Sequence, residues 1–420
     1  MTIRLINHDD ILYVFAKKAK KNTGYAQAYA TLMQAYAIDA AGLSVLKERG
    51  YPGVVQALTG AARMKKNTSV SRLNAIDLFA GCGGLTQGMH EAGFHTKVAI
   101  ELEPVAVDAY KLNHPNTHVI QNDIRKVDVA EIKKLLNGEQ LHLLAGCPPC
   151  QGFSSVRRLN KKKSVRDKRN SLVVEYFRLV KELRPLTIMM ENVPGLKDYY
   201  LFKDIVKELH ELGYNPKVEV VNVKDYGVPQ SRRRLVMIGS LLGELNLPKV
   251  CTDKVTVRDA IFNLETPEKT LDPLHKIVAK HTDAVNERIR LTPKNGGSWK
   301  DLPEEYTLKC HKKQNIGFND IYGRLRWDDY STTITGGCLN PSKGRFLHPE
   351  QDRALTPREA ALLQSFPKKY KFPTNIPKQA LALLIGNALP PKFSYFQSIN
   401  IASHINEHFA AGRVIREATA

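Results

Sequence analysis

The sequence predicts an α/β protein with a doubly wound, mostly parallel sheet, a second, smaller and irregular domain, and an N-terminal helical extension. Three observations lead to this fold class. Short apolar runs alternate with helical patterns from Leu73 onward, as in proteins where a helix crosses between parallel strands. Residues 246–352 are rich in Pro, Gly, Lys and Thr with weaker periodicity, whereas residues 1–70 are rich in Ala and Lys and show helical spacing.

The composition is that of a globular, positively charged protein. Of 420 residues, 43% are hydrophobic and 25% charged, which excludes wholesale disorder, and 62 basic against 42 acidic side chains give a net charge of +20. The surplus favours a polyanionic partner, nucleic acid first, although a ribosome-associated or membrane-surface protein also fits the charge. No apolar run approaches the roughly 20 residues of a membrane span. The apolar stretch near the N-terminus is too short for a signal peptide, so we expect a cytoplasmic protein without a membrane partner.

These changes in composition and periodicity divide the chain into four segments. Residues 1–70 are the helical extension, to which the sequence assigns no role, and residues 71–245 are the sheet domain. Residues 246–380 are the irregular domain, and residues 381–420 contain a further helical pattern and a tail.

Six apolar runs are expected to be strands of the sheet. In doubly wound sheets, ligands bind beyond the carboxyl ends of the strands, so the residues after each run are candidate site residues. The runs are Ala75–Phe79, Lys97–Ile100, His118–Ile120, Leu141–Leu144, Thr187–Met190 and Leu235–Ile238.

A glycine-rich turn after the first run predicts a cofactor site. Gly81 and Gly83 lie between a strand and a helix, where the backbone can approach a ligand closely, although glycines alone are often structural. A dinucleotide fingerprint would need a third glycine where Thr86 stands, which disfavours pyrophosphate. Glu101 suits ribose hydroxyls, and Asp123 is placed to accept a hydrogen bond from an adenine amino group, so we expect a nucleoside-containing cofactor.

Cys147 and Cys150 follow the fourth run and leave three interpretations open. A redox pair would suit a thioredoxin-like domain, and a zinc site would need a second pair, for which Cys310-His311 is poorly spaced. In the third interpretation Cys150 is a nucleophile whose thiolate is favoured by nearby cations. The following stretch, residues 157–169, contains eight Lys or Arg. Such a run is usually a solvated loop, but its position favours a loop that clamps the substrate.

Glu191 stands at the end of a wholly apolar strand. Partial burial there disfavours the charged carboxylate and suits it to donate a proton, with a capping role at the edge of the core as the alternative. Further along, Arg232 and Arg234 alternate at the entrance of a strand and therefore share one face.

Taken together, these motifs resemble the cytosine-5 DNA methyltransferase family of the bacterial restriction-modification type. The resemblance runs from about Leu73 to His404 and is specific because its parts occur in the family's order. They are DLFAGCGGL at 77, a glutamate at 101, NDI at 122, GCPPCQGFSS at 146, ENVPG at 191, QSRRRLVMIG at 230, LTPREAALLQSFP at 355 and GNALPP at 386.

The resemblance implies a Rossmann-like fold, S-adenosylmethionine as cofactor, no metal, and defined roles at the site. Cys150 would be the nucleophile, Glu191 the acid at the ring nitrogen of the base, and Arg232 and Arg234 would hold the base and the cysteine region. The last motif returns to the sheet domain, which assigns residues 381–420 to it. The implied cofactor contacts are Phe79, Gly81, Gly83, Glu101, Asp123, Ile124, Pro149 and Asn387.

The resemblance also implies duplex DNA as partner and residues 246–380 as the target-recognition domain. Arg324 and Arg326 would read guanine edges, while Thr333 and Thr335 would bind phosphate near a flipped base, although paired threonines are also ordinary strand residues. The basic loop would contact the DNA backbone through Arg157, Arg158, Lys161, Lys162 and Lys163.

Two rival functions remain at this stage: the same chemistry on transfer RNA, and a DNA-binding module without turnover. The long recognition-like domain counts against the first, and the presence of Cys150, Glu191 and both arginines counts against the second. We expect a monomer, with a cognate restriction endonuclease acting on the same site as its partner in such a system.

Overall fold

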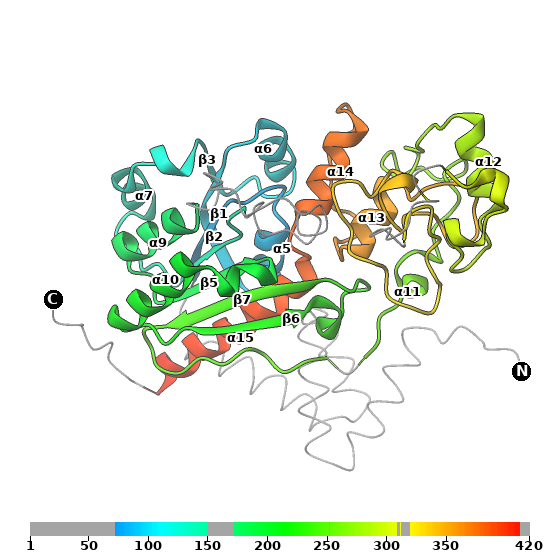
Figure 1. The fold of residues 1–420 in the computed structure, drawn as a ribbon. Helices are drawn as coiled ribbons and strands as arrows, with labels where there is room; N and C mark the ends of the chain where they lie inside the picture. Colours follow the sequence, from blue (N-terminus) through cyan, green and yellow to red (C-terminus); the bar gives the residue numbers. More distant parts are fainter. Residues whose placement is uncertain (1–71, 150–171, 252, 309–310, 312–319, 412–420) are drawn as a thin grey trace, which may run out of the picture. The chain divides into compact units, whose positions relative to one another are not determined.

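A seven-stranded mixed sheet organises the structure, a computed structural model that describes residues 72–149, 172–251, 253–308, 311 and 320–411. The strand order is β3-β2-β1-β4-β5-β7-β6 (Figure 1). The pairs from β3 to β5 are parallel, whereas β7 runs antiparallel between β5 and β6. The strands are β1 (Leu73–Leu78), β2 (Phe94–Glu101), β3 (His118–Gln121), β4 (Leu143–Gly146), β5 (Thr187–Asn192), β6 (Lys217–Asn222) and β7 (Arg233–Ser240).

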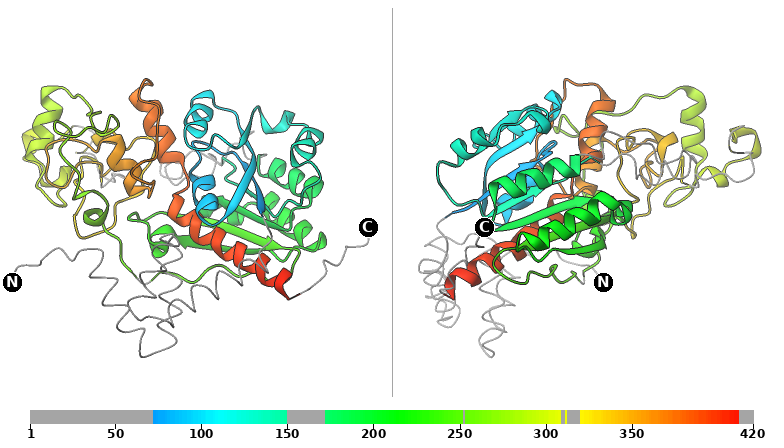
Figure 2. Two further views of the ribbon diagram at one scale, coloured as in Figure 1. Left: turned by 180° about the vertical axis from the view of Figure 1, so that it is seen from behind. Right: turned by 60° about the vertical axis from the view of Figure 1, so that its left-hand side comes forward.

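The central strands are apolar because helices cover both faces of the sheet. All residues of β1, β4 and β5 are buried, as expected of parallel strands that are packed on both sides. The main core joins one face to the helices α7 (Val129–Leu136), α9 (Leu172–Leu183) and α10 (Tyr200–Glu211). On the other face, α5 (Gly84–Glu91) packs against α15 (Pro391–Ala410), because Gly88 lets the backbones touch. Figure 2 shows α15 crossing this second face.

These observations confirm the predicted fold class, and each of the six predicted runs lies within or overlaps a strand. The sequence analysis missed β6, whose segment Lys217–Asn222 is half-exposed at the edge of the sheet. Lys217 and Glu219 interrupt its apolar residues, so β6 lacks the continuous apolar run that identified the buried strands. The predicted extension, residues 1–70, lies outside the described residues.

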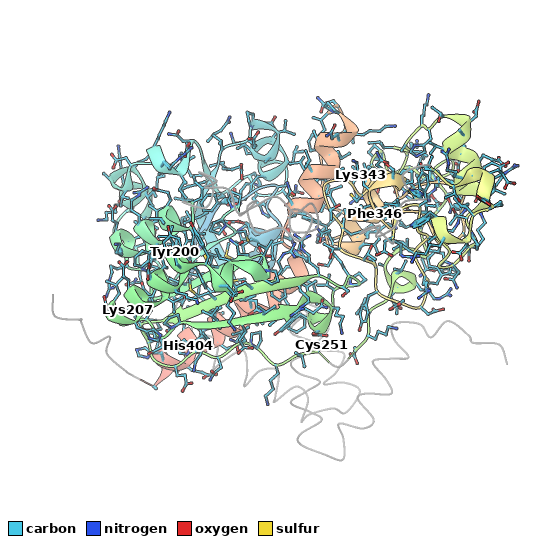
Figure 3. All side chains as sticks on the ribbon, in the orientation of Figure 1. Tyr200, Lys207, Cys251, Lys343, Phe346 and His404 are labelled. Atoms are coloured by element: carbon cyan, nitrogen blue, oxygen red, sulfur yellow. The ribbon has the colours of Figure 1, made fainter. Side chains whose placement is uncertain are left out.

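Residues 246–352 contain little regular structure where they are described. Two short helices, α11 (Val257–Ile261) and α12 (Asp283–Leu291), are joined by 3₁₀ turns and by isolated bridges such as Arg324–Leu347. A second core holds this part together and includes Phe346, labelled in Figure 3. The same core contains residues of α13 (Pro357–Leu363) and α14 (Lys378–Asn387), and it reaches Cys82 in the glycine turn.

No helix among the described residues is both long and apolar enough to cross a membrane.

A buried polar network fixes the glycine turn to the sheet. The Thr86 hydroxyl, in the first turn of α5, donates to Oδ2 of Asp77 at 2.6 Å and lies 2.8 Å from the Tyr110 hydroxyl. Asp77 is completely buried in β1, and burial raises the pKa of its carboxyl group to about 7. Thr86, which occupies the place of the third fingerprint glycine, therefore has a structural partner of its own.

This pKa predicts a specific dependence of stability on pH. The Asp77 carboxyl binds a proton more tightly in the folded than in the unfolded protein, so its contribution to stability is lost as pH rises from about 4 to about 7. Relative to Asp77→Asn, the wild-type protein should lose about 1.4 kcal/mol of unfolding free energy per pH unit near pH 5, and about half of that per pH unit near pH 7. Urea unfolding at pH 5, 6 and 7 measures this difference. The exposed Asp253→Asn serves as control, and a difference that is constant with pH would show that Asp77 is ionised throughout this range.

Candidate active site

The predicted cofactor residues gather at the carboxyl ends of β1, β2 and β3. After β1 the backbone enters the left-handed region at Phe79 (φ 60°), Gly81 (φ 54°) and Gly83 (φ 90°). The amide of Gly83 donates to the carbonyl of Ala80 at 2.9 Å and closes a tight turn. At Phe79 this conformation is unfavourable for a side chain, so the packed surroundings must hold it there.

The glycines of this turn differ in what surrounds the position where a Cβ atom would be. A Cβ atom on Gly81 would meet nothing within 4 Å, whereas one on Gly83 would lie 2.7 Å from the ring of His114. On Gly84 it would lie 2.3 Å from the Leu389 carbonyl oxygen. Gly81 therefore faces open space that a ligand can enter, and Gly83 and Gly84 permit close packing.

Glu101 closes the next strand end and organises its backbone. Its Oε2 atom accepts the Gly81 amide at 2.7 Å, and Oε1 accepts the amides of Leu102 and Glu103 at 2.8 and 2.9 Å. Leu102, which the sequence analysis missed, is 53% exposed beside this carboxylate. An exposed leucine next to an open turn suits the flat apolar face of a base, and the signal was an apolar residue directly after the acidic strand end.

The third strand end is tied to its own loop. The carboxylate of Asp123 accepts the Arg125 amide at 3.0 Å and forms an ion pair with the Arg125 guanidinium, which lowers the pKa of Asp123 to about 2. Ile124 is buried, and its carbonyl accepts a hydrogen bond from Arg178 at 3.0 Å. An adenine amino group would therefore share the Asp123 carboxylate with Arg125.

These residues fit S-adenosylmethionine. The open side of Gly81, the carboxylates of Glu101 and Asp123 and the exposed Leu102 offer a polar and an apolar surface of the kind a nucleoside needs. The two remaining predicted contacts, Pro149 and Asn387, are both exposed.

The cysteine segment begins at the end of β4. The Cys147 amide donates to the Leu78 carbonyl, and the Pro148 carbonyl accepts the Asn192 side-chain amide at 2.9 Å. Burial and the carboxylate of Glu191 hold the pKa of the Cys147 thiol well above its usual range, which disfavours the thiolate form that a redox pair would need at this residue. Cys150 lies outside the described residues, as do the basic residues Arg157, Arg158, Lys161, Lys162 and Lys163.

The zinc interpretation is not tested by the structure, because Cys150 and Cys310 lie outside the described residues. Within the described part of the chain, no group of three or more His, Cys, Asp or Glu side chains is arranged to hold a metal ion.

Glu191 is 7% exposed at the end of β5 and faces a guanidinium group. The Nε atom of Arg234 lies 2.7 Å from Oε1 of Glu191. The antiparallel register of β5 and β7, in which Glu191 is opposite Val236, brings the two side chains together. The Arg234 charge compensates the buried carboxylate, which would otherwise be costly to bury.

Arg232 is also buried, but its guanidinium holds backbone rather than a carboxylate. Its Nη1 atom donates to the carbonyls of Ile334 and Gly386, both at 3.0 Å, and burial lowers its pKa to about 9. Next to it, the Gln230 side chain donates to Gln364 at 2.7 Å and accepts the Ile334 amide at 2.8 Å. These two residues join the β7 entrance to the 331–337 segment and to the end of α14, a function that the sequence analysis did not foresee.

The predicted DNA-contacting residues of the irregular domain differ in exposure. Arg326 and Thr335 are exposed, and Thr333 is half-buried with its hydroxyl donating to the Ser231 carbonyl at 2.9 Å. Arg324, in contrast, is 0% exposed. Its guanidinium donates to Asp352 and to the carbonyls of Ile289, Thr292, His348 and Gln351.

The prediction that Arg324 reads a guanine edge is therefore wrong for this geometry. A base edge cannot reach a guanidinium that is enclosed by four carbonyls and a carboxylate. The sequence could not distinguish the two arginines of Gly323-Arg324-Leu325-Arg326, because alternation places them on one face without showing which neighbours cover each.

Comparisons with known proteins agree with the geometry. Residues 73–400 match the family described as C-5 cytosine-specific DNA methylase. The chain is 38% identical over 328 residues to the Type II methylase M.HgiDII of Herpetosiphon aurantiacus, covering 75% of this chain and 91% of that protein. It is 36% identical to the Type II methyltransferase M1.HphI of Haemophilus parahaemolyticus, covering 76% and 84% of the two chains.

Solved structures show the same fold. A candidate DNA modification methyltransferase from a prophage of E. coli superposes with a TM-score of 0.62 and 26% identity, covering 80% of this chain and 99% of that one. A DNMT2 variant of Spodoptera frugiperda superposes with a TM-score of 0.52 at 20% identity, covering 78% and 99%, a likeness that concerns the fold alone.

The two arginines of the irregular domain should respond differently to substitution. Arg324→Met should lower the free energy of unfolding by about 3–5 kcal/mol, because it leaves buried carbonyls and Asp352 without their donor. Arg326→Met, the matched control at an exposed position, should change it by less than about 0.5 kcal/mol. Urea unfolding of both variants tests this, and equal stabilities would contradict the structural role given to Arg324.

Proposed function

The chain belongs to the C-5 cytosine-specific DNA methylase family, and from this premise we propose that it transfers a methyl group from S-adenosylmethionine to carbon 5 of cytosine in duplex DNA. The observation that carries the proposal is the convergence of three features at one edge of the sheet. These are the open glycine turn after β1, the Cys147-Pro148-Pro149 segment after β4 and the buried Glu191–Arg234 pair at the end of β5. Each supplies a part that methylation of a pyrimidine carbon requires.

Carbon 5 of cytosine is a poor nucleophile, and the chain's own residues would activate it. Attack of the Cys150 thiolate at carbon 6, with a proton delivered to the ring nitrogen by Glu191, converts the ring into an enamine that is nucleophilic at carbon 5. S-adenosylmethionine would supply an electrophilic methyl group on a positively charged sulfur. Water at the site would then take the proton from carbon 5, which restores the 5,6 double bond and releases Cys150 as a thiolate, and the ring nitrogen would return its proton to Glu191.

The arginines would position the acid. The Arg234 guanidinium lies 2.7 Å from Oε1 of Glu191. Because this pairing favours the charged carboxylate, Glu191 would take up a proton as the base enters and then deliver it to the ring nitrogen. Arg232 fixes the wall of the site through its contacts with Ile334 and Gly386.

None of this chemistry can occur inside a stacked duplex, so the target base must be flipped into the site. Flipping costs a few kcal/mol, which contacts with the DNA backbone from a protein of net charge +20 would offset. Among the described residues, the exposed Arg326 and Thr335 are the candidates, and the basic residues between 157 and 163 are further candidates. Thr333 is not one of them, because its hydroxyl donates its single proton to the Ser231 carbonyl. Residues 246–380 would recognise the target sequence, with Arg324 holding their scaffold.

The relatives favour DNA over transfer RNA as substrate. The relatives that are 36–38% identical to this chain are Type II methylases. The DNMT2 structure is only 20% identical, so its likeness concerns the fold and carries no argument about the substrate. The Type II relatives support a role as the modification enzyme of a restriction-modification system. We further propose that it acts as a monomer in the bacterial cytoplasm, with a cognate endonuclease as partner. A competition assay with duplex DNA and transfer RNA decides between the substrates.

The covalent step predicts an adduct at one of two neighbouring cysteines. In a mixed-sequence duplex that contains 5-fluorocytosine, carbon 5 carries fluorine instead of hydrogen, so the elimination that releases the cysteine cannot occur. With S-adenosylmethionine, the wild-type protein should therefore form an adduct with this duplex that survives denaturation. Cys150→Ala should form none while binding cofactor and DNA normally, and Cys147→Ala, the matched control, should still form it. Mass spectrometry of the adduct locates the bond, and an adduct in Cys150→Ala would end the mechanism.

Glu191→Gln should lower the single-turnover rate of methyl transfer by at least about a hundredfold, because the amide cannot deliver a proton. Cofactor and DNA affinities should stay within threefold. The matched control is Glu359→Gln, which also removes a charge from a buried pair, since Glu359 is 1% exposed and 2.7 Å from Arg353. Its folded fraction should turn over normally, and equal rate losses in both variants would reduce Glu191 to a structural role.

A further inference from the structure

Beneath the glycine turn lies a buried cluster that neither the motifs nor the proposed chemistry uses. Tyr370, His114 and Tyr110 pack together, with ring centroids of His114 4.8 Å from Tyr110 and 6.0 Å from Tyr370. Their side chains surround Gly83, where a Cβ atom would lie 2.7 Å from His114 and 2.8 Å from the Tyr370 hydroxyl. The cluster is therefore in direct contact with the backbone that forms the cofactor turn.

The hydrogen bonds in this cluster run in one direction. The Tyr370 hydroxyl donates to the Cys82 carbonyl at 2.6 Å and lies 3.1 Å from Nε2 of His114. A phenol has one proton to donate, and Nε2 of His114 also lies 3.3 Å from the Gly83 carbonyl oxygen, which can only accept. Nε2 therefore carries a proton that is shared between the phenol oxygen and the Gly83 carbonyl. Burial supports this arrangement, because it lowers the pKa of His114 to about 3 and raises the pKa of Tyr370 well above its usual range. His114 is thus a neutral ring that carries its proton on Nε2.

The Cys82 carbonyl belongs to the peptide unit that closes the turn. The amide of the same unit, that of Gly83, donates to the Ala80 carbonyl at 2.9 Å. In a trans peptide the carbonyl and the amide point in opposite directions, so fixing one end of this unit fixes the other. The Tyr370 hydroxyl therefore holds the turn that presents the open side of Gly81.

The backbone that carries the phenol is held by side chains of two other segments. Arg358 donates to the Tyr370 carbonyl at 3.0 Å, and Arg358 is in turn paired with Asp272 at 2.5 Å. The next residue, Lys371, is bound through both its amide and its carbonyl by the Asn113 side chain, at 2.9 and 2.8 Å. A side chain anchored in this way loses little further entropy when it holds the turn.

We infer that Tyr370 is a positioning residue for the cofactor site: its hydroxyl holds the Cys82–Gly83 peptide in the conformation that binds the nucleoside cofactor. The inference rests on the proposed function in that the ligand is S-adenosylmethionine. The expected signature is a loss of cofactor affinity without a comparable loss of the rate at saturating cofactor, since Tyr370 touches neither the base nor the reacting carbon.

The test compares two tyrosines that make the same hydrogen bond. Both side chains are buried, Tyr370 at 3% exposure and Tyr214 at 0%. The Tyr214 hydroxyl donates to the Pro185 carbonyl at 2.6 Å and belongs to the main core, away from the cofactor turn. Titration calorimetry with S-adenosylmethionine and with its demethylated product S-adenosylhomocysteine should show an approximately tenfold rise in Kd for Tyr370→Phe. Tyr214→Phe should stay within twofold of the wild-type protein. Both variants should keep the wild-type turnover rate at saturating cofactor within threefold.

A second measurement uses the ligand-free protein. Amide hydrogen exchange of residues 81–84 should be faster in Tyr370→Phe than in the wild-type protein, and unchanged in Tyr214→Phe. If Tyr370→Phe does not fold, His114→Leu takes its place in the test. In His114→Leu the Tyr370 hydroxyl still donates to the Cys82 carbonyl but no longer receives a hydrogen bond from His114, so the Kd for S-adenosylmethionine should rise about threefold.

The outcomes separate the inference from the function on which it rests. A wild-type protein that binds neither cofactor form would overturn the proposed function. A wild-type protein that binds, with equal affinities in Tyr370→Phe and Tyr214→Phe and unchanged exchange at residues 81–84, would overturn the inference alone.

Discussion

The site depends on a buried charge at the end of an apolar strand. Glu191 can remain in the interior because β7, inserted antiparallel beside β5, brings Arg234 to within 2.7 Å of it. A purely parallel sheet would place the carboxyl end of the neighbouring strand there instead, and Arg234 stands at the beginning of its strand. In this sheet, the antiparallel strand is thus what supplies the counter-charge of Glu191.

Around this pair, the structure uses backbone contacts to hold parts that are distant in sequence. Arg232, Gln230 and Gln364 connect the β7 entrance, the 331–337 segment and α14 through buried hydrogen bonds. Such bonds are strong where water is excluded, and an unmatched partner is costly. The cofactor turn is held in a similar way, by Asp77 and Thr86 on one side and by Tyr370 on the other.

Much of the sheet domain could be predicted from the sequence because buried parallel strands are continuous apolar runs whose ends are marked by Gly81, Glu101 or Glu191. The sequence analysis missed β6 because this strand is half-exposed and its apolar residues are interrupted by Lys217 and Glu219. Arg324 was misjudged because a residue's exposure depends on segments far away in sequence, here residues 289–292 and 348–352. Tyr370 and Leu102 carry no motif of their own, and only their neighbours in space give them a role.

The close approach at Gly386 leaves no room for a side chain. A Cβ atom there would lie 2.1 Å from the carbonyl carbon of Thr335, so α14 and the 331–337 segment meet backbone to backbone. Any residue larger than glycine at 386 would push the two backbones apart. Because the Arg232 guanidinium bridges the Ile334 and Gly386 carbonyls across this contact, the same change would also break the anchorage of the β7 entrance.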